Sequence, residues 1–302
     1  MKMHVFLVAI LLACAAVVCC AQTANISDWL GLIGKKECAQ AKALCTLFVG
    51  SENLNEKVEA QKCLANVALC GHDILSLEGN EVGGGSMHGS YTQEAVDEAL
   101  AHLNTGIKLA PQDLTIHMGR LHILEVSGRY QEMVKALDES CTLYQGNETP
   151  KPWLAYAPEL ADLGQLSAGV EFMKVLDKHY PKNGDIVSNI GAFLSMQKKF
   201  NEAIPYLQNA VELAPNDSLN AWDLGHAYDA SDQVDLADKW YRKALALPPD
   251  QDMPTEVHCL YAEFVEKKLK DRPRACTLEK ASCEKDKQTA CVPVTSAPVA
   301  AH

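Results

Sequence analysis

Residues 184–217 read GDIVSNIGAFLSMQKKFNEAIPYLQNAVELAPND, and residues 218–251 read SLNAWDLGHAYDASDQVDLADKWYRKALALPPDQ. Placed one above the other, the two 34-residue segments carry glycine, alanine and proline at the same offsets. The matching pairs are Gly191 and Gly225, Ala203 and Ala237, Ala210 and Ala244, and Pro215 and Pro249. A period of this length corresponds to one supersecondary unit, so we expect stacked copies of a single motif.

The repeated small residues predict that each segment is a pair of antiparallel helices. Small side chains allow two helix backbones to approach closely. Leu213-Ala214-Pro215 and Leu247-Pro248-Pro249 end the second helix, because proline lacks a backbone donor and clashes with the preceding turn. Each pair leaves an apolar face that only a neighbouring pair covers, which predicts an all-α solenoid of helical hairpins.

The pattern resembles the tetratricopeptide repeat family. Earlier parts of the chain match the register more weakly, over 150–183, over 114–145 and at a single helix from Thr92 to Leu109. The resemblance implies a binding scaffold without catalysis, whose first helices line a concave face. The expected organisation is a signal peptide at 1–21, a cysteine-paired helical hairpin at 22–77, a glycine-rich loop at 78–90, repeats at 91–251, a capping helix at 252–272, and a cysteine-containing, largely disordered tail at 273–302.

The first residues predict export. One lysine precedes an apolar run from Val5 to Val18, and Cys19-Cys20-Ala21 supplies the small residues that precede a cleavage site. We expect cleavage after Ala21, with a retained membrane anchor as the alternative. The protein is then periplasmic, or secreted or in the endoplasmic reticulum lumen.

Four cysteines predict a cross-linked hairpin. Cys38 and Cys45 are seven residues apart, as are Cys63 and Cys70, so each pair lies on one helix face. An antiparallel hairpin turning near Leu54 brings Cys38 opposite Cys70 and Cys45 opposite Cys63, and we expect these two disulfides. A zinc site is the weaker alternative, because structural zinc cysteines usually lie two to four residues apart.

Five further cysteines remain in the expected mature chain, an odd number: Cys141, Cys259, Cys276, Cys283 and Cys291. One of them is therefore free or joins another chain. No pairing among the five follows from the sequence.

The resemblance implies a ligand-binding surface on the first helices of the two clearest repeats. The candidate ligand-binding residues are Asn189, Trp222, Asp223, His226 and Asp229. An amide, an aromatic ring and carboxylates suit a basic or aromatic extended peptide. The competing interpretation is that Trp222 packs between helices while the carboxylates form a solvated surface.

The net charge of −12 favours basic or neutral protein partners and argues against nucleic acid or an anionic membrane surface. We expect no cofactor, no metal and no catalytic residues, since no convergent group of catalytic side chains is apparent. The alternative function is structural, with chains linked into oligomers through the odd cysteine.

Overall fold

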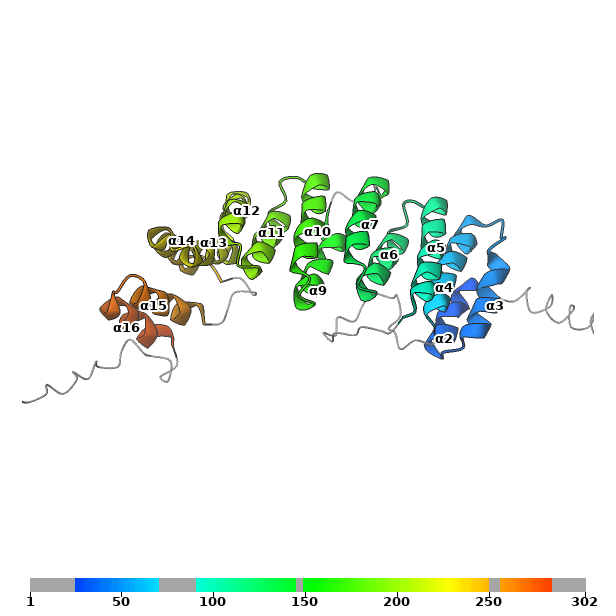
Figure 1. Ribbon diagram of the computed structural model, residues 1–302, viewed down its shortest axis with the longest axis horizontal. Coiled ribbons are helices and arrows are strands. Elements are labelled where there is room, and N and C mark those ends of the chain that lie inside the picture. The colour runs from blue at the N-terminus through cyan, green and yellow to red at the C-terminus, as the bar shows by residue number, and fades with distance from the viewer. Residues whose placement is uncertain (1–24, 71–90, 145–148, 250–255, 284–302) are drawn as a thin grey trace, which may run out of the picture. The chain divides into compact units, whose positions relative to one another are not determined.

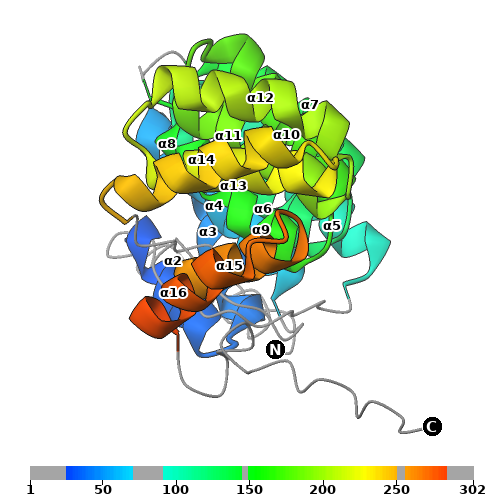
Figure 2. The ribbon, with the colours of Figure 1, turned by 90° about the vertical axis from the view of Figure 1, so that its left-hand side faces the viewer.

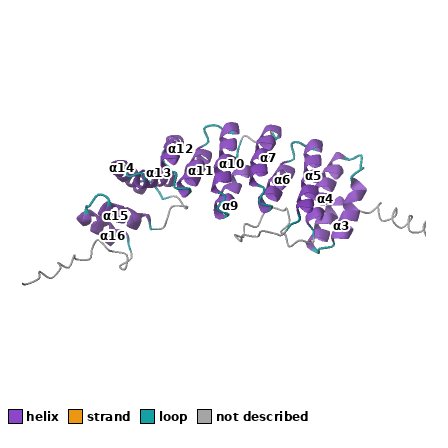
Figure 3. Cartoon of the chain, in the orientation of Figure 1, coloured by secondary structure: helices purple, strands orange, loops and turns teal. Residues whose placement is uncertain are grey.

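The computed structural model describes residues 25–70, 91–144, 149–249 and 256–283, and every regular element in these ranges is a helix (Figures 1 and 3). The all-α prediction is confirmed. The chain divides between Trp153 and Leu154 into two compact units. The predicted signal peptide and glycine-rich loop lie outside the described residues.

The first unit is a run of helices in which each packs on the next. Its elements are η1 (Ile26–Asp28), α2 (Trp29–Gly34), α3 (Cys38–Phe48), α4 (Leu54–Leu69), α5 (Gln93–Leu109), α6 (Leu114–Val126) and α7 (Tyr130–Leu143). Helix α4 packs on α3 on one side and on α5 on the other. Helix α4, which precedes the predicted glycine-rich loop, is therefore the helix that pairs with the predicted single helix from Thr92 to Leu109.

The second unit continues the same alternation. After the short α8 (Lys151–Leu154), its elements are α9 (Tyr156–Asp162), α10 (Leu166–His179), α11 (Gly184–Met196), α12 (Phe200–Leu213), α13 (Ser218–Ala230), α14 (Val234–Ala246), α15 (Val257–Lys267) and α16 (Arg272–Ser282). Helices α11 with α12 and α13 with α14 form close pairs, and α15 and α16 pair with each other beside α13 and α14 (Figure 2).

The two clearest repeats begin and turn at equivalent residues. Asn183 caps α11 by accepting a hydrogen bond from the Ile186 amide, and Asp217, 34 residues on, caps α13 in the same way. Lys198 and Asp232 follow the two first helices with left-handed backbone angles, φ of 61° and 59°. This conformation ends a helix and redirects the chain into the next one.

Glycines mark where the paired helices approach most closely. A Cβ placed on Gly191 would lie 2.5 Å from Cδ2 of Leu207, and one on Gly225 would lie 2.8 Å from Cδ1 of Tyr241. Real side chains do not tolerate such separations, so the small residues at this offset follow from packing.

Both predicted disulfides of the N-terminal hairpin are formed. Cys38 pairs with Cys70 and Cys45 with Cys63, at Cα separations of 5.7 and 6.1 Å. Cys45 and Cys63 are fully buried in a small core with Trp29, Ala41 and other apolar residues. The Cys45–Cys63 bond therefore fixes α3 against α4 within the core, and the Cys38–Cys70 bond fixes them at the open end of the hairpin.

The prediction of a largely disordered tail from residue 273 is wrong for its first part. Helix α16 covers Arg272–Ser282, with Asp271 accepting a hydrogen bond from the Arg274 amide as its cap. Pro273 lies in the first turn, where its missing amide hydrogen costs nothing, so it starts a helix here and does not only end the preceding one. The Cys259–Cys283 disulfide, with a Cα separation of 5.5 Å, ties α15 to the residue after α16.

One helix, α15, lies in the segment expected to be a capping helix, and together with α16 it forms a second covalently closed hairpin, the C-terminal hairpin. Within the described ranges, no helix combines the length and the apolar character needed to cross a membrane.

Candidate partner-binding face

Helices α11 and α13 are neighbouring first helices, and their unburied side chains form what we call the first-helix face. Asn189, the predicted residue on α11, is partly exposed. Its side-chain amide donates to the carbonyl of Asp185 in the same helix at 2.7 Å. Its carbonyl oxygen is the atom left for a partner.

Trp222 packs between helices and does not present its ring to the face. Its side chain is 7% exposed, and its ring centroid lies 4.6 Å from that of Tyr241 on α14. The structure therefore supports the packing interpretation of this residue. The ring is part of the core of the last repeat and supports the face from behind.

Asp223 follows Trp222 and is partly buried. Burial raises the pKa of its carboxyl to about 7, and the nearby Asp217 carboxylate adds to the effect. At neutral pH this carboxyl group is partly protonated, as a hydrogen-bond donor, and partly ionised, as an anion. It can accordingly interact with either an acceptor or a cation.

His226 is the most accessible of the predicted residues. It is exposed, and its ring meets the ring of Phe200 edge-on at a centroid distance of 5.7 Å. Within the described part of the chain, no group of three or more His, Cys, Asp or Glu side chains is arranged to hold a metal ion. The exposed ring thus has one aromatic neighbour, Phe200.

Asp229 is engaged by the C-terminal hairpin. Nζ of Lys268 lies 3.7 Å from its Oδ1 and 2.9 Å from Oδ1 of Asp232. Asp229 Oδ1 is buried, and no hydrogen-bond partner reaches it. Ser195, which occupies the equivalent position 34 residues earlier on α11, also has a buried side-chain oxygen without a hydrogen bond. Two adjacent repeats thus each hold a buried polar oxygen at the same place.

The structure brings Asp223, His226 and Asp229 onto α13 and sets Asn189 on the neighbouring helix, while Trp222 turns inward. Lys268 was not anticipated from the sequence. It lies 39 residues after Asp229, and only the docking of α15 and α16 brings it close.

The C-terminal hairpin docks through aromatic and charged contacts. The Tyr241 ring meets those of Tyr261 and Phe264 at centroid distances of 5.9 and 5.2 Å. Asp238 on α14 accepts hydrogen bonds from the Tyr261 hydroxyl at 2.7 Å and from Nη2 of Arg274 at 2.9 Å. These contacts cover the end of the last repeat. None of them involves α11.

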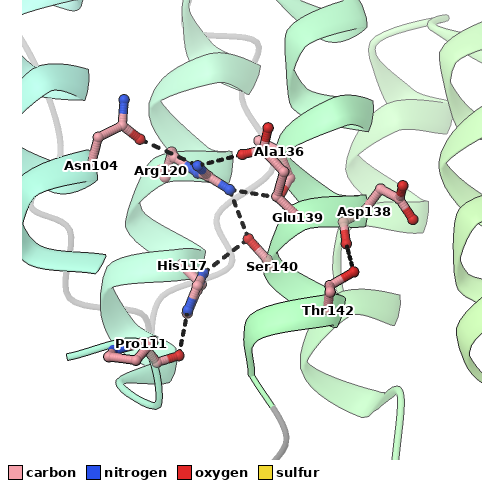
Figure 4. Close-up of polar contacts among 9 residues, drawn as sticks. All are labelled: Asn104, Pro111, His117, Arg120, Ala136, Asp138, Glu139, Ser140 and Thr142. Carbon is pink, nitrogen blue, oxygen red and sulfur yellow. Dashed lines mark hydrogen bonds and ion pairs between the residues drawn. The ribbon is translucent and has the colours of Figure 1, made fainter. Parts of the chain in front are cut away.

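A second polar cluster, in the first unit, was also missed (Figure 4). Arg120 is 7% exposed, and its guanidinium donates to Asn104, Glu139, Ser140 and the carbonyl of Ala136. His117 is fully buried. The cluster ties α6 to α5 and α7 within one packed layer, which is a structural role.

Cys141, next to Ser140, is the free cysteine of the described chain. Burial is the main cause that raises the pKa of its thiol to about 12. At neutral pH almost none of it is thiolate, the form that attacks a disulfide. This half-buried thiol is consequently a poor site for linking two chains.

The geometry defines a helical repeat protein of the solenoid class. Residues 186–217 and 221–251 match the family described as "Tetratricopeptide repeat". These two segments therefore match tetratricopeptide repeats, in the register that their glycines and alanines predict. No curated protein sequence matches it.

Solved structures of similar fold include MamA 41-end from Desulfovibrio magneticus RS-1, with 22% identity, a TM-score of 0.44, and coverage of 58% of this chain and 95% of that one. YrrB, described as a TPR protein with an unusual peptide-binding site, is 17% identical with a TM-score of 0.36, covering 52% of this chain and 80% of its own. PilF of Pseudomonas aeruginosa is 12% identical with a TM-score of 0.42, covering 65% and 88% respectively.

Proposed function

We propose that the first-helix face of α11 and α13 binds an extended segment of a protein partner. The observation that carries this proposal is a set of accessible side chains on two neighbouring first helices, Asn189 and Met196 on α11 and His226 on α13. An amide, a methionine and an aromatic ring together offer hydrogen bonds and apolar contact to an extended chain.

Exposed side chains of the face suit a partner's side chains. Met196 is 56% exposed, and methionine adapts its shape to varied apolar groups. His226, one turn before Asp229, adds an exposed aromatic ring. A bound segment would therefore place apolar side chains on Met196 and His226 and direct a backbone amide toward the side-chain carbonyl oxygen of Asn189.

The charge of the face favours a basic or neutral segment. The charged residues of this face on α11 and α13 include Asp185, Asp223 and Asp229. Neither helix contains a lysine or an arginine. Lys268 already neutralises part of this charge through Asp229. A lysine or arginine of a partner would compete with Lys268 for the same carboxylate, whereas an acidic segment would be repelled.

We further propose that the protein works after export, without a cofactor, without catalysis and without nucleic acid as its main partner. The disulfides at both ends of the described chain suit an oxidising compartment. A structural role through intermolecular disulfides remains the alternative function, but the half-buried, protonated thiol of Cys141 disfavours it.

The test compares two variants that add equal positive charge. Met196→Lys with His226→Lys changes two residues of the face and no fully buried side chain. Asn201→Lys with Asn209→Lys adds the same charge at exposed positions of α12. The chain from Gln22 onward is produced in an oxidising host and incubated with periplasmic or secretory extract, and captured proteins are identified by mass spectrometry.

We expect a partner that wild type and the α12 variant retain and that the face variant loses. Equal capture by all three proteins would rule out this face as the binding site. Capture of disulfide-linked copies of the chain alone would favour the structural alternative.

A further inference from the structure

The outward surface of α14 carries an exposed strip in which apolar and basic side chains alternate. Leu236 is 39% exposed, and Trp240 is partly exposed one turn later. Nζ of Lys239 and of Lys243 lie 5.8 and 4.6 Å from the centroid of the Trp240 ring. We call these four residues the α14 strip.

The exposure of Trp240 distinguishes it from the other tryptophans. The chain has four, and Trp29, Trp153 and Trp222 are 5%, 0% and 7% exposed. Tryptophan and leucine side chains left at the surface together, with cations beside them, are typical of a contact surface, where a ring supplies area at low entropic cost.

Charges next to the strip leave its two lysines available. In the part of the chain that the structure describes, Lys239 and Lys243 make no ion pair, and their contact is with the Trp240 ring. Asp238, on the same helix, is already held by Arg274, the Tyr261 hydroxyl and, at 3.7 Å, Arg242. A shallow depression lies alongside, and Lys239, Arg242 and Lys243 contribute three of its five lining residues.

We propose that the α14 strip is a docking site for a short acidic segment of a protein partner that carries an apolar side chain. The segment's carboxylates would pair with Lys239 and Lys243, and its apolar side chain would cover Leu236 and the Trp240 ring. Covering the ring would also exclude water from the cation–π contacts, which strengthens them.

A protein segment fits better than an anionic membrane. The chain carries a net charge of −12, so a wide anionic surface repels most of the molecule. A peptide contacts only the strip and stays within about 10 Å of it, the screening length at 0.1 M salt. Asp235 and Asp238 are also interleaved with the basic residues, which suits spaced carboxylates and not a continuous layer of phosphates.

This site is separate from the first-helix face. The same repeat has carboxylates along α13 and cations along the outside of α14, so its two helices favour partners of opposite charge. A scaffold with both sites would hold a basic segment and an acidic segment at once. The proposal does not depend on the first-helix face being occupied.

The experiment uses Trp240 as its own reporter, since the other three tryptophans are buried. The chain from Gln22 onward is titrated with a synthetic peptide that alternates glutamate with leucine, and with a matched peptide in which lysine replaces glutamate. Intrinsic fluorescence and its quenching by acrylamide are followed at low and at raised salt. Anionic and neutral phospholipid vesicles form a separate arm.

The acidic peptide is expected to protect Trp240 from acrylamide and to bind more weakly as salt rises, while the lysine peptide does neither. Lys239→Glu with Lys243→Glu should weaken binding by about tenfold, because it removes two exposed ion pairs, each of modest strength. Lys108→Glu with Lys135→Glu changes the net charge equally at exposed sites elsewhere and should bind like wild type.

Equal binding of the acidic peptide by the α14 variant and the control variant would overturn the proposal. Protection of Trp240 by anionic vesicles but not by the acidic peptide would also overturn it, and so would the absence of protection by either of them. Circular dichroism of both variants establishes that they are folded. Met196→Lys with His226→Lys should bind the acidic peptide normally, so failure here and failure of the first-helix face are told apart.

Discussion

The hydroxyl oxygen of Ser140 lies 3.0 Å from Nδ1 of His117, the ring nitrogen opposite the one that contacts the chain at Pro111. Nε2 of His117 is 2.9 Å from the carbonyl oxygen of Pro111, which can only accept, so Nε2 carries the hydrogen. Nδ1 then accepts from the Ser140 hydroxyl, which in turn accepts from Nη2 of Arg120 at 3.1 Å. One hydroxyl thus satisfies two buried neighbours.

Ser140→Ala should destabilise the first unit by about 1 to 3 kcal/mol, because it leaves a buried acceptor on His117 and a buried donor on Arg120 without a partner. Hydrogen exchange of the α6 and α7 amides measures the loss locally. Thr142→Ala is the control, since that exposed hydroxyl only donates to the carbonyl of Asp138 in its own helix. Equal effects of the two changes would contradict the proposed network.

Acid should destabilise the first unit through His117. Burial lowers the pKa of this histidine below its ordinary value of 6.5, and the nearby Arg120 charge acts in the same direction. As pH falls through 6.5 the unfolded chain takes up a proton that the folded chain does not, so the free energy of unfolding decreases. His117→Gln should flatten this decrease in denaturant titrations between pH 7.5 and 5. An unchanged slope would show that other groups cause it.

Asp223→Asn should stabilise the second unit above neutral pH. The folded pKa of Asp223 is raised from 3.8 to about 7, so between these two pH values the folded chain holds a proton that the unfolded chain has released. Its contribution to stability is present below pH 3.8 and is lost as pH rises through 7. At pH 8 the variant should show the higher unfolding midpoint, and the difference should shrink on acidification. Asp185→Asn, at an exposed site, should show neither effect.

Two glycine substitutions should have opposite effects. Gly225→Ala places a Cβ 2.8 Å from the Tyr241 ring, and such overpacking costs about 1 to 3 kcal/mol. At Gly184 the nearest atom would be 3.7 Å away, so alanine fits and gains up to about 1 kcal/mol from its helix propensity. Thermal unfolding of the two variants measures the contrast. Destabilisation by both would point to backbone effects and not to the Tyr241 contact.

Residue spacing along the sequence was sufficient to predict the repeats and the first hairpin. The 34-residue interval between Gly191 and Gly225 marks a close helix packing that recurs in both repeats. The equal spacing of the cysteine pairs leaves one antiparallel arrangement that bridges both. Helix α16 was not predicted, because a proline such as Pro273 occurs both just after one helix and in the first turn of the next. The choice depends on Asp271, whose capping bond is visible only in three dimensions.

The candidate site was less predictable, for two physical reasons. Helix α13 buries residues on several sides, including Leu224, Tyr228 and Trp222, so its sequence shows no single apolar stripe to indicate which way the tryptophan turns. Lys268 reaches Asp229 only because a separate hairpin docks on the last repeat. Contacts of this kind are set by tertiary packing, which a repeat pattern does not encode.

Covalent bonds close the first and the last hairpin of the described chain: Cys38–Cys70 and Cys45–Cys63 at one end, Cys259–Cys283 at the other. A unit built of helical repeats frays from a terminal copy, which has one neighbour where an inner copy has two. Cross-linking a terminal hairpin in each unit raises the cost of opening there and leaves the other helices dependent on packing alone. Reduction would then remove this protection from both units together, so the lifetime of each unit follows the redox state of its surroundings.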